Sequence, residues 1–154
     1  MTTVTQLPDL STSMSAILFR LASWSEDDDR ELPRRGHGYR PDMTPAELYD
    51  SVRAWWVLNP QRAERYQYAV AVHDGVTRGV WEIDHATWRQ ASPETARRLG
   101  RSRRRWSFQG KRPSAAVEEE FVGRIGLRVP RTRLTGENVF GIGSVVAYWP
   151  RRAR

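Results

Sequence analysis

The residues best suited to chemistry are arginines that stand beside tryptophans. The segment ELYDSVRAWW, residues 47–56, carries Arg53, Trp55 and Trp56 within four positions. A guanidinium binds phosphate through two parallel hydrogen bonds, and an indole ring stacks on a nucleobase. A second set, RRRWSF at 103–108, repeats the pattern with Arg103, Arg104, Arg105 and Trp106. These sets suit a surface that binds something flat and negatively charged.

The first set falls on a predicted helix with a clear start. Thr44 can cap it, and a proline and a glutamate follow at its first and third positions. The spacing predicts a helix over 44–57 with Leu48, Val52 and Trp55 on its buried stripe. Trp56 would then lie at the edge of the stripe and line the mouth of a pocket with Arg53. The alternative is that both tryptophans belong to the core.

Charge also points to nucleic acid. The net charge is +7, the pI is about 10.7, and Lys111 is the only lysine. Codon bias could explain arginine in place of lysine, but it does not explain the excess of base over acid. A basic domain of this size is a candidate for nucleic-acid binding. We expect the run 97–112 to form one exposed face with Arg53; the alternative is a solvated loop.

The sequence favours a binding domain over an enzyme. His37, His73 and His85 lack metal-binding spacing, and no phosphate-binding glycine loop occurs. His85 follows Asp84, but neighbours on a strand point to opposite faces. Asp42 with Gln109-Gly110-Lys111 resembles part of a nuclease site only weakly, because the two parts lie far apart. No catalytic residue, metal site or cofactor is therefore predicted.

The chain of 154 residues is long enough for one domain with its own core. We expect a flexible tail at 1–13, a single domain at 14–150 and a basic tail at 151–154. The predicted strands are 15–23, a hairpin over 66–83 with its turn at Asp74-Gly75, 104–108 and 139–149. Besides 44–57, helical turns are expected after residue 92 and after Ser114, while 25–42 is expected to be a loop. The order is that of an α+β fold with a small, curved, mostly antiparallel sheet or β-barrel, the first helix lying across one opening.

Composition also bears on location. No apolar run approaches the roughly 18 residues of a membrane helix, and the first residues do not resemble a signal peptide. The absence of cysteine excludes disulfides and fits a reducing compartment. The expected location is therefore the cytoplasm, with no membrane partner.

Four segments in order resemble a bacterial group of PUA-like domains, which are similar to ASCH, EVE and YTH domains. They are ELYDSVRAWW, RYQYAVAVHDGVTRGVWEIDHATW, RRWSFQGK and FVGRIGLRVP, and the match covers about residues 15–130. Ala54, Gln109 and the C-terminal GENVFGIGS depart from the pattern. The resemblance implies a small barrel with flanking helices whose mouth binds RNA or a modified base. The residues it assigns to the mouth and rim are Arg53, Trp55, Trp56, Arg78, Trp88, Arg105, Trp106 and Lys111.

The function predicted from the sequence is therefore non-catalytic binding of RNA or DNA, including recognition of a flipped or modified base. Two alternatives stay open. One is an interaction or regulatory partner in a restriction, toxin or phage-defence system, which uses the basic face to bind an acidic protein. The other is a nuclease or hydrolase whose site the sequence does not reveal.

Overall fold

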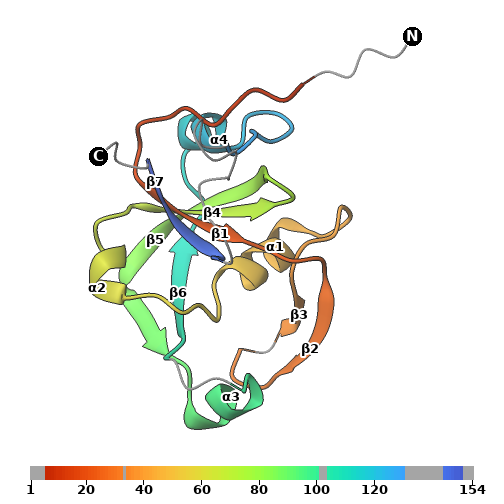
Figure 1. Cartoon of the computed structure of the whole chain (residues 1–154), viewed down its shortest axis with the longest axis vertical. Helices are drawn as coiled ribbons and strands as arrows, with labels where there is room; N and C mark the ends of the chain where they lie inside the picture. The colour runs from red at the N-terminus through yellow and green to blue at the C-terminus, as the bar shows by residue number, and fades with distance from the viewer. Residues whose placement is uncertain (1–5, 33, 101–103, 131–143, 151–154) are drawn as a thin grey trace.

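The computed structural model describes residues 6–32, 34–100, 104–130 and 144–150. Within them the chain forms an α+β fold with a five-stranded sheet, a two-stranded sheet and four helices (Figure 1). The strands are β1 (Ala16–Arg20), β2 (Ser25–Asp29), β3 (Arg34–His37), β4 (Tyr68–His73), β5 (Val76–Gln90), β6 (Trp106–Lys111) and β7 (Val146–Trp149). The helices are α1 (Pro45–Val52), α2 (Pro60–Ala63), α3 (Pro93–Arg98) and α4 (Ala115–Phe121).

The large sheet is mixed, with strand order β6-β5-β4-β1-β7. β1 pairs with β4 in parallel, whereas the other neighbours are antiparallel. The sheet is therefore mostly antiparallel, as expected, but contains one parallel pair, and the described strands form an open sheet rather than a closed barrel. A parallel pair needs a long crossover connection. Residues 21–67 provide it, and they contain the β2–β3 hairpin, α1 and α2.

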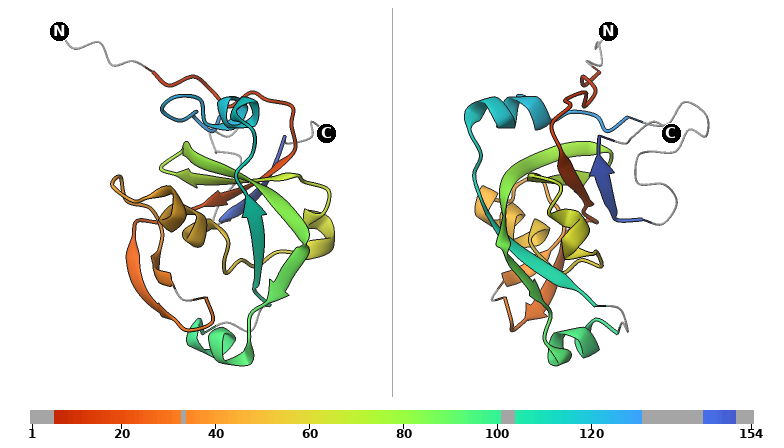
Figure 2. Two further views of the ribbon diagram at one scale, coloured as in Figure 1. Left: turned by 180° about the vertical axis from the view of Figure 1, so that it is seen from behind. Right: turned by 90° about the vertical axis from the view of Figure 1, so that its left-hand side faces the viewer.

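Curvature was correctly expected. β5 is 15 residues long and bends as it runs from the end of the molecule near α4 to the end near α3 (Figures 1 and 2). Its pairing with β6 shifts register between Asp84 and Arg89. Such irregularities bend a strand and increase its twist. The sheet is therefore curved along β5.

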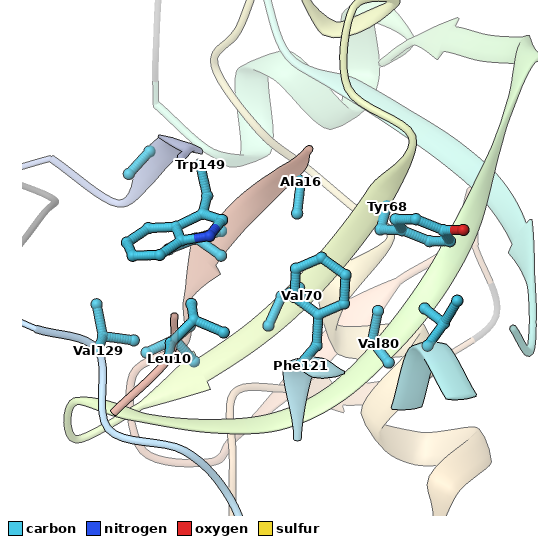
Figure 3. Packing of buried hydrophobic residues seen from close by; sticks show 12 residues of the cluster. Leu10, Ala16, Tyr68, Val70, Val80, Phe121, Val129 and Trp149 are labelled. Atoms are coloured by element: carbon cyan, nitrogen blue, oxygen red, sulfur yellow. The ribbon is translucent and has the colours of Figure 1, made fainter. Parts of the chain in front are cut away.

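Both faces of the sheet are buried. On one face, Phe121 of α4 packs against Tyr68, Val70 and Val80 (Figure 3). On the other, Phe19 lies 4.8 Å from the Trp56 ring and 5.7 Å from the Phe108 ring, measured between centroids. The predicted hairpin is confirmed, and Asp74 and Gly75 have the positive φ angles (53° and 74°) that its two-residue turn requires.

The segment expected to be a loop at 25–42 contains the β2–β3 hairpin, so that prediction was wrong. Its acidic and basic halves face each other across the hairpin. Arg34 lies 3.0 Å from Asp29, and His37 lies 3.2 Å from Asp27. Opposite charges on paired strands stabilise a strand composition that is unfavourable in isolation.

The first helix is confirmed but ends at Val52, five residues earlier than predicted. The next residues pair with β6 instead. Trp56 and Trp106 exchange both backbone hydrogen bonds at 2.9 Å, and the Phe108 N–H donates to the Arg53 carbonyl at 3.0 Å. Backbone pairing with β6 has therefore replaced a further helical turn. The two tryptophans are not on a helix, so helical spacing does not describe where their side chains lie.

Other segments agree with the sequence to different degrees. α3, α4, β6 and β7 lie within or beside their predicted ranges, whereas α2 was not expected. Part of the expected N-terminal tail packs on the fold, because Leu10 is 2% exposed and donates its N–H to the Arg128 carbonyl. Residues 1–5 and the expected basic tail at 151–154 lie outside the described residues. No helix of the described residues is long and apolar enough to cross a membrane.

Candidate ligand-binding cavity

A cavity of about 240 Å³ lies where the end of β1 meets the β2–β3 hairpin and the segment after α1. We call it the tryptophan cavity. Three of the residues predicted from the sequence line it: Trp55, Trp56 and Arg105. Its other lining residues are Arg20, Leu21, Ala22, Asp27, Arg34, His37, Gly38, Ser51, Ala54, Val57, Leu99 and Val145.

Both tryptophans of the cavity wall are buried. Trp55 is 5% exposed and its indole N–H donates to Asp29 at 2.9 Å. Trp56 is 9% exposed and its indole N–H donates to the Val52 carbonyl at 2.7 Å. The expectation that Trp56 lies at the edge of a helical stripe was therefore wrong. Both rings belong to the core, and both line the cavity from that side.

Behind the Trp55 ring lies a buried ionic network centred on Asp29. Its side chain is 0% exposed and accepts hydrogen bonds from the backbone N–H groups of Glu31 and Leu32. Burial opposes ionisation of this carboxyl. The hydrogen bonds from Leu32 and Trp55, together with the charges of Arg34 and Arg98, outweigh burial and lower its pKa. Asp29 therefore stays ionised.

Arg34 connects this network to the end of α1. Its guanidinium donates to the Asp50 carbonyl at 2.9 Å and to the Ala54 carbonyl at 3.0 Å. Burial lowers its pKa, and Asp29 and Asp27 oppose that change. Because it holds two carbonyls of the segment that carries the tryptophans, Arg34 fixes the position of this wall of the cavity.

The cavity wall is rich in cations. Among the described lining residues are the three guanidinium groups of Arg20, Arg34 and Arg105 and the single carboxylate of Asp27. Arg105 also donates to the Trp55 carbonyl at 3.1 Å. Arg34 is paired with Asp29 behind the wall, and the guanidinium groups of the wall can donate to a ligand that is anionic or rich in acceptor oxygens.

Ser51 supplies an unusual polar group to the same wall. It is 1% exposed, and its hydroxyl has no hydrogen-bond partner within the described part of the chain. A buried polar group without a partner costs about 1–3 kcal/mol. A ligand in the cavity that offered a partner to this hydroxyl would recover that cost.

The other predicted residues lie elsewhere. Arg53 is half-buried, 5.3 Å from the Tyr49 ring, and lines neither this cavity nor the one described below. Trp88 packs 5.2 Å from Phe108 in the core, and Trp106 is half-buried. Arg78 lines a different cavity, Arg104 and Lys111 are exposed, and Arg103 lies outside the described residues.

The arginine run at 97–112 does not lie on one face in the way the sequence suggested. Arg98 contacts Asp27 at 2.6 Å near α3, whereas Arg112 pairs with Glu118 of α4 at 3.1 Å. α3 and α4 lie at opposite ends of the molecule (Figure 1). β6 runs between these ends, so the positive charges of the run are divided between them.

Sequence reasoning missed Ser51, Arg34, Asp27 and His37. Three of them belong to the hairpin expected to be a loop, so no pattern placed them beside the tryptophans. Ser51 offered one weak signal, because serine is not favoured inside helices. Its neighbours on the predicted stripe, Leu48 and Val52, were identified correctly as buried.

His85, the histidine considered for catalysis, has structural partners. The nitrogen Nε2 of His85 lies 2.8 Å from the Tyr66 carbonyl, and its Nδ1 lies 3.0 Å from the Trp88 indole nitrogen. Since an indole N–H only donates and a carbonyl only accepts, His85 carries its proton on Nε2. Among the described residues no group of three or more His, Asp or Glu side chains is placed to hold a metal ion.

Comparison with known proteins gives no relative: no family model, curated protein or solved structure matches this chain.

Proposed function

We propose that the chain is a PUA-like, non-catalytic domain that binds nucleic acid and holds one unstacked base in the tryptophan cavity. The observation that carries this proposal is the composition of the cavity wall. Two buried tryptophans, three guanidinium groups and the hydroxyl of Ser51, which has no partner among the described residues, meet there. The four ordered segments that resemble PUA-like domains support the same proposal.

The size of the cavity suits a single flat group. Sites for drug-sized ligands occupy roughly 300–1,000 Å³, and this cavity has about 240 Å³. Its apolar wall of indole rings gives a flat ring van der Waals contact, and the polar atoms at its edge can read acceptors and donors on that ring. A base that is already unpaired enters at a lower cost than a base taken from a duplex.

Phosphate contacts would come from exposed arginines around the opening. Arg97 and Arg104 are exposed and lie within two positions in sequence of Leu99 and Arg105, which line the cavity. Such contacts contribute affinity without sequence preference and weaken as salt rises. The cavity would add affinity for one base, and that part would depend little on salt.

The test uses a substitution that fills the cavity without removing a core residue. Ala22 is exposed and lines the cavity, so Ala22→Phe should occupy it. Ala116→Phe, at an exposed position on α4 outside the cavity, is the matched control. Binding of a labelled single-stranded oligonucleotide would be titrated at several salt concentrations, beside a duplex with one unpaired base and a fully paired duplex.

We expect Ala22→Phe to weaken binding of the first two probes by about tenfold, the scale of one stacked base. The slope of log affinity against log salt should stay as in wild type, because the phosphate contacts remain. Ala116→Phe should bind as wild type does. The proposal fails if the wild-type chain binds no probe at low salt, or if Ala22→Phe and Ala116→Phe bind equally.

A further inference from the structure

A second cavity, of about 510 Å³, lies between the first turns of α1, the start of β5 and the end of β6. It shares no lining residue with the tryptophan cavity. We call it the Arg78 cavity. Its lining residues are Tyr39, Pro41, Met43, Thr44, Pro45, Ala46, Leu48, Tyr49, Arg78, Gly79, Val80, Trp81, Gly110, Arg112 and Glu118. Its volume falls in the range of ordinary small-molecule sites.

Aromatic rings form much of the wall. The Trp81 ring lies against Gly79, where a Cβ atom would approach the ring to 2.7 Å and Leu48 to 3.0 Å. Glycine at this position therefore lets the indole lie close to the strand. The Tyr49 ring is 5.9 Å from the Trp81 ring, and its hydroxyl accepts a hydrogen bond from the Gly110 N–H at 3.0 Å. Both flat surfaces are thus held in position before any ligand binds.

One guanidinium in this wall has no counter-ion among the described residues. Arg78 stacks at 4.6 Å on the Tyr39 ring and donates to the His73 carbonyl at 3.2 Å. No carboxylate of the described residues forms a salt bridge with it, and its buried Nε has no partner among them. By contrast, Arg112 at the cavity edge is paired with Glu118. A partly buried, uncompensated charge attracts an anionic or strongly polar oxygen.

We infer that the Arg78 cavity is a second binding site, for a flat heteroaromatic ring that carries an anionic or acceptor oxygen, the chemistry of a nucleotide. The ring would pack against Trp81 and Tyr49, and the oxygen would approach the Arg78 guanidinium. Two sources have this chemistry: a free mononucleotide, or another base of a strand whose first base occupies the tryptophan cavity. The first source does not depend on the proposed function, and the second rests on it.

The geometry allows the second source. Gly38 lines the tryptophan cavity and Tyr39, the next residue, lines the Arg78 cavity. On α1, Ser51 lines the tryptophan cavity and Tyr49 lines the Arg78 cavity. The two cavities therefore share a stretch of backbone at residues 38–39, where consecutive Cα atoms are about 3.8 Å apart.

The experiment titrates the full chain with adenosine 5′-monophosphate, guanosine 5′-monophosphate and inorganic phosphate by calorimetry, and with single-stranded oligonucleotides of two to eight nucleotides. The variants are Arg78→Gln, Arg78→Lys and Trp81→Leu. Arg112→Gln is the control, because this arginine is exposed at the cavity edge and already paired. Ala22→Phe, which fills the other cavity, is tested beside them. Thermal unfolding of each variant establishes that it is folded.

We expect a mononucleotide or an oligonucleotide of two or more nucleotides to bind at least tenfold more weakly to Arg78→Gln and Trp81→Leu. Arg112→Gln should bind as wild type does. If Arg78→Gln does not fold, Arg78→Lys, which keeps the charge and loses the planar fork, should show a smaller loss of the same kind. If the Arg78 and Trp81 variants lose affinity for mononucleotides, the ligand of the Arg78 cavity is a free nucleotide. If they lose affinity only for oligonucleotides, the ligand is a second base of a bound strand.

The controls separate this inference from the proposed function. If Ala22→Phe abolishes binding of every probe while the Arg78 and Trp81 variants bind normally, the proposed function stands and the second site is refuted. If the Arg78 and Trp81 variants lose mononucleotide binding while Ala22→Phe binds normally, the second site stands without the first. Equal binding of ribonucleotides and inorganic phosphate would also refute the inference, because the ring would then contribute nothing.

Discussion

Two buried regions of this molecule differ in the polarity of their side chains. The cluster beneath α4, which includes Phe121, Tyr68 and Val70, is mostly hydrocarbon. Its polar side-chain groups are the Tyr68 hydroxyl and the Trp149 indole N–H, which donates to the Thr12 carbonyl at 2.8 Å. The tryptophan cavity instead has Arg34 and the hydroxyl of Ser51, unpartnered among the described residues, in its wall, and ionised Asp29 lies behind the Trp55 ring.

This difference separates the residues that stabilise the fold from the residues that are suited to binding. Burying apolar surface is favourable without any specific partner. Burying charge gains little stability even when the pair is well made, because desolvation offsets the attraction. The α4 cluster is therefore explained by folding alone. The polar wall is explained better by what it borders, which is a cavity lined with cations and aromatic rings.

The largest effect should come from the α4 cluster. Phe121 is 0% exposed and lies 5.5 Å from the Tyr68 ring. Phe121→Ala should lower the free energy of unfolding by about 3–5 kcal/mol, because it removes a large buried side chain and leaves a cavity. The loss relative to wild type should be the same at pH 7 and pH 3, since no titrating group is removed. Urea unfolding at both pH values measures it.

Asp29→Asn should cost a similar amount at neutral pH, about 3–5 kcal/mol, because it leaves Arg34 buried without its main counter-charge. Its loss should depend on pH. The pKa of Asp29 is lower in the folded protein than its ordinary 3.8, so the carboxylate stabilises the fold above that value and loses this contribution as the pH falls through the folded pKa.

The difference between Asp29→Asn and wild type should therefore narrow below about pH 4. Glu26→Gln, at an exposed position on the same strand, serves as the control and should lie close to wild type throughout. A difference that stays constant on acidification would mean that the role of Asp29 is steric rather than electrostatic.

The two regions also differed in how well the sequence predicted them. Alternation in Tyr68, Val70 and Val72 and the turn at Asp74-Gly75 are local signals, and they predicted the hairpin that the structure confirms. The polar wall depends on contacts between residues distant in sequence. Asp29 contacts Trp55 across 26 positions, and no local pattern encodes that bond.

The acidic composition of β2 disfavours a strand when read alone, and only its pairing with β3 reverses this. The predicted roles of Trp55 and Trp56 failed for a related reason. They assumed a helix through Val57, whereas backbone pairing with β6 ended it at Val52. The sequence identified the two tryptophans as candidates, but only the fold shows which atoms surround them.

A smaller effect distinguishes the two tryptophans. The Trp55 indole donates to an ionised carboxylate, and the Trp56 indole donates to a neutral carbonyl. Hydrogen bonds to charged groups contribute about 1.5–3 kcal/mol and neutral ones about 0.5–1.5. Trp55→Phe should therefore destabilise more than Trp56→Phe, and only Trp55→Phe should move the acid-dependent loss of stability toward higher pH. If both variants show the same pH dependence, the Trp55–Asp29 bond does not hold the carboxylate ionised.

The smallest effect is the most informative, because it should have opposite signs for folding and binding. Ser51→Ala removes a buried hydroxyl that has no partner among the described residues, and alanine favours the helix more than serine does. The unliganded protein should become more stable by about 1 kcal/mol, since the cost of an unsatisfied group disappears. If a base entering the tryptophan cavity supplies the missing partner, the same variant should bind a single-stranded oligonucleotide about fivefold more weakly, the size of one hydrogen bond.

Ser25→Ala, at an exposed position outside the cavity, should change neither quantity. A purely structural role for Ser51 would move stability and binding in the same direction or leave binding unchanged. Destabilisation of the unliganded protein by Ser51→Ala would mean that the hydroxyl already has a partner in solution, and the argument that it awaits a ligand would fail with it.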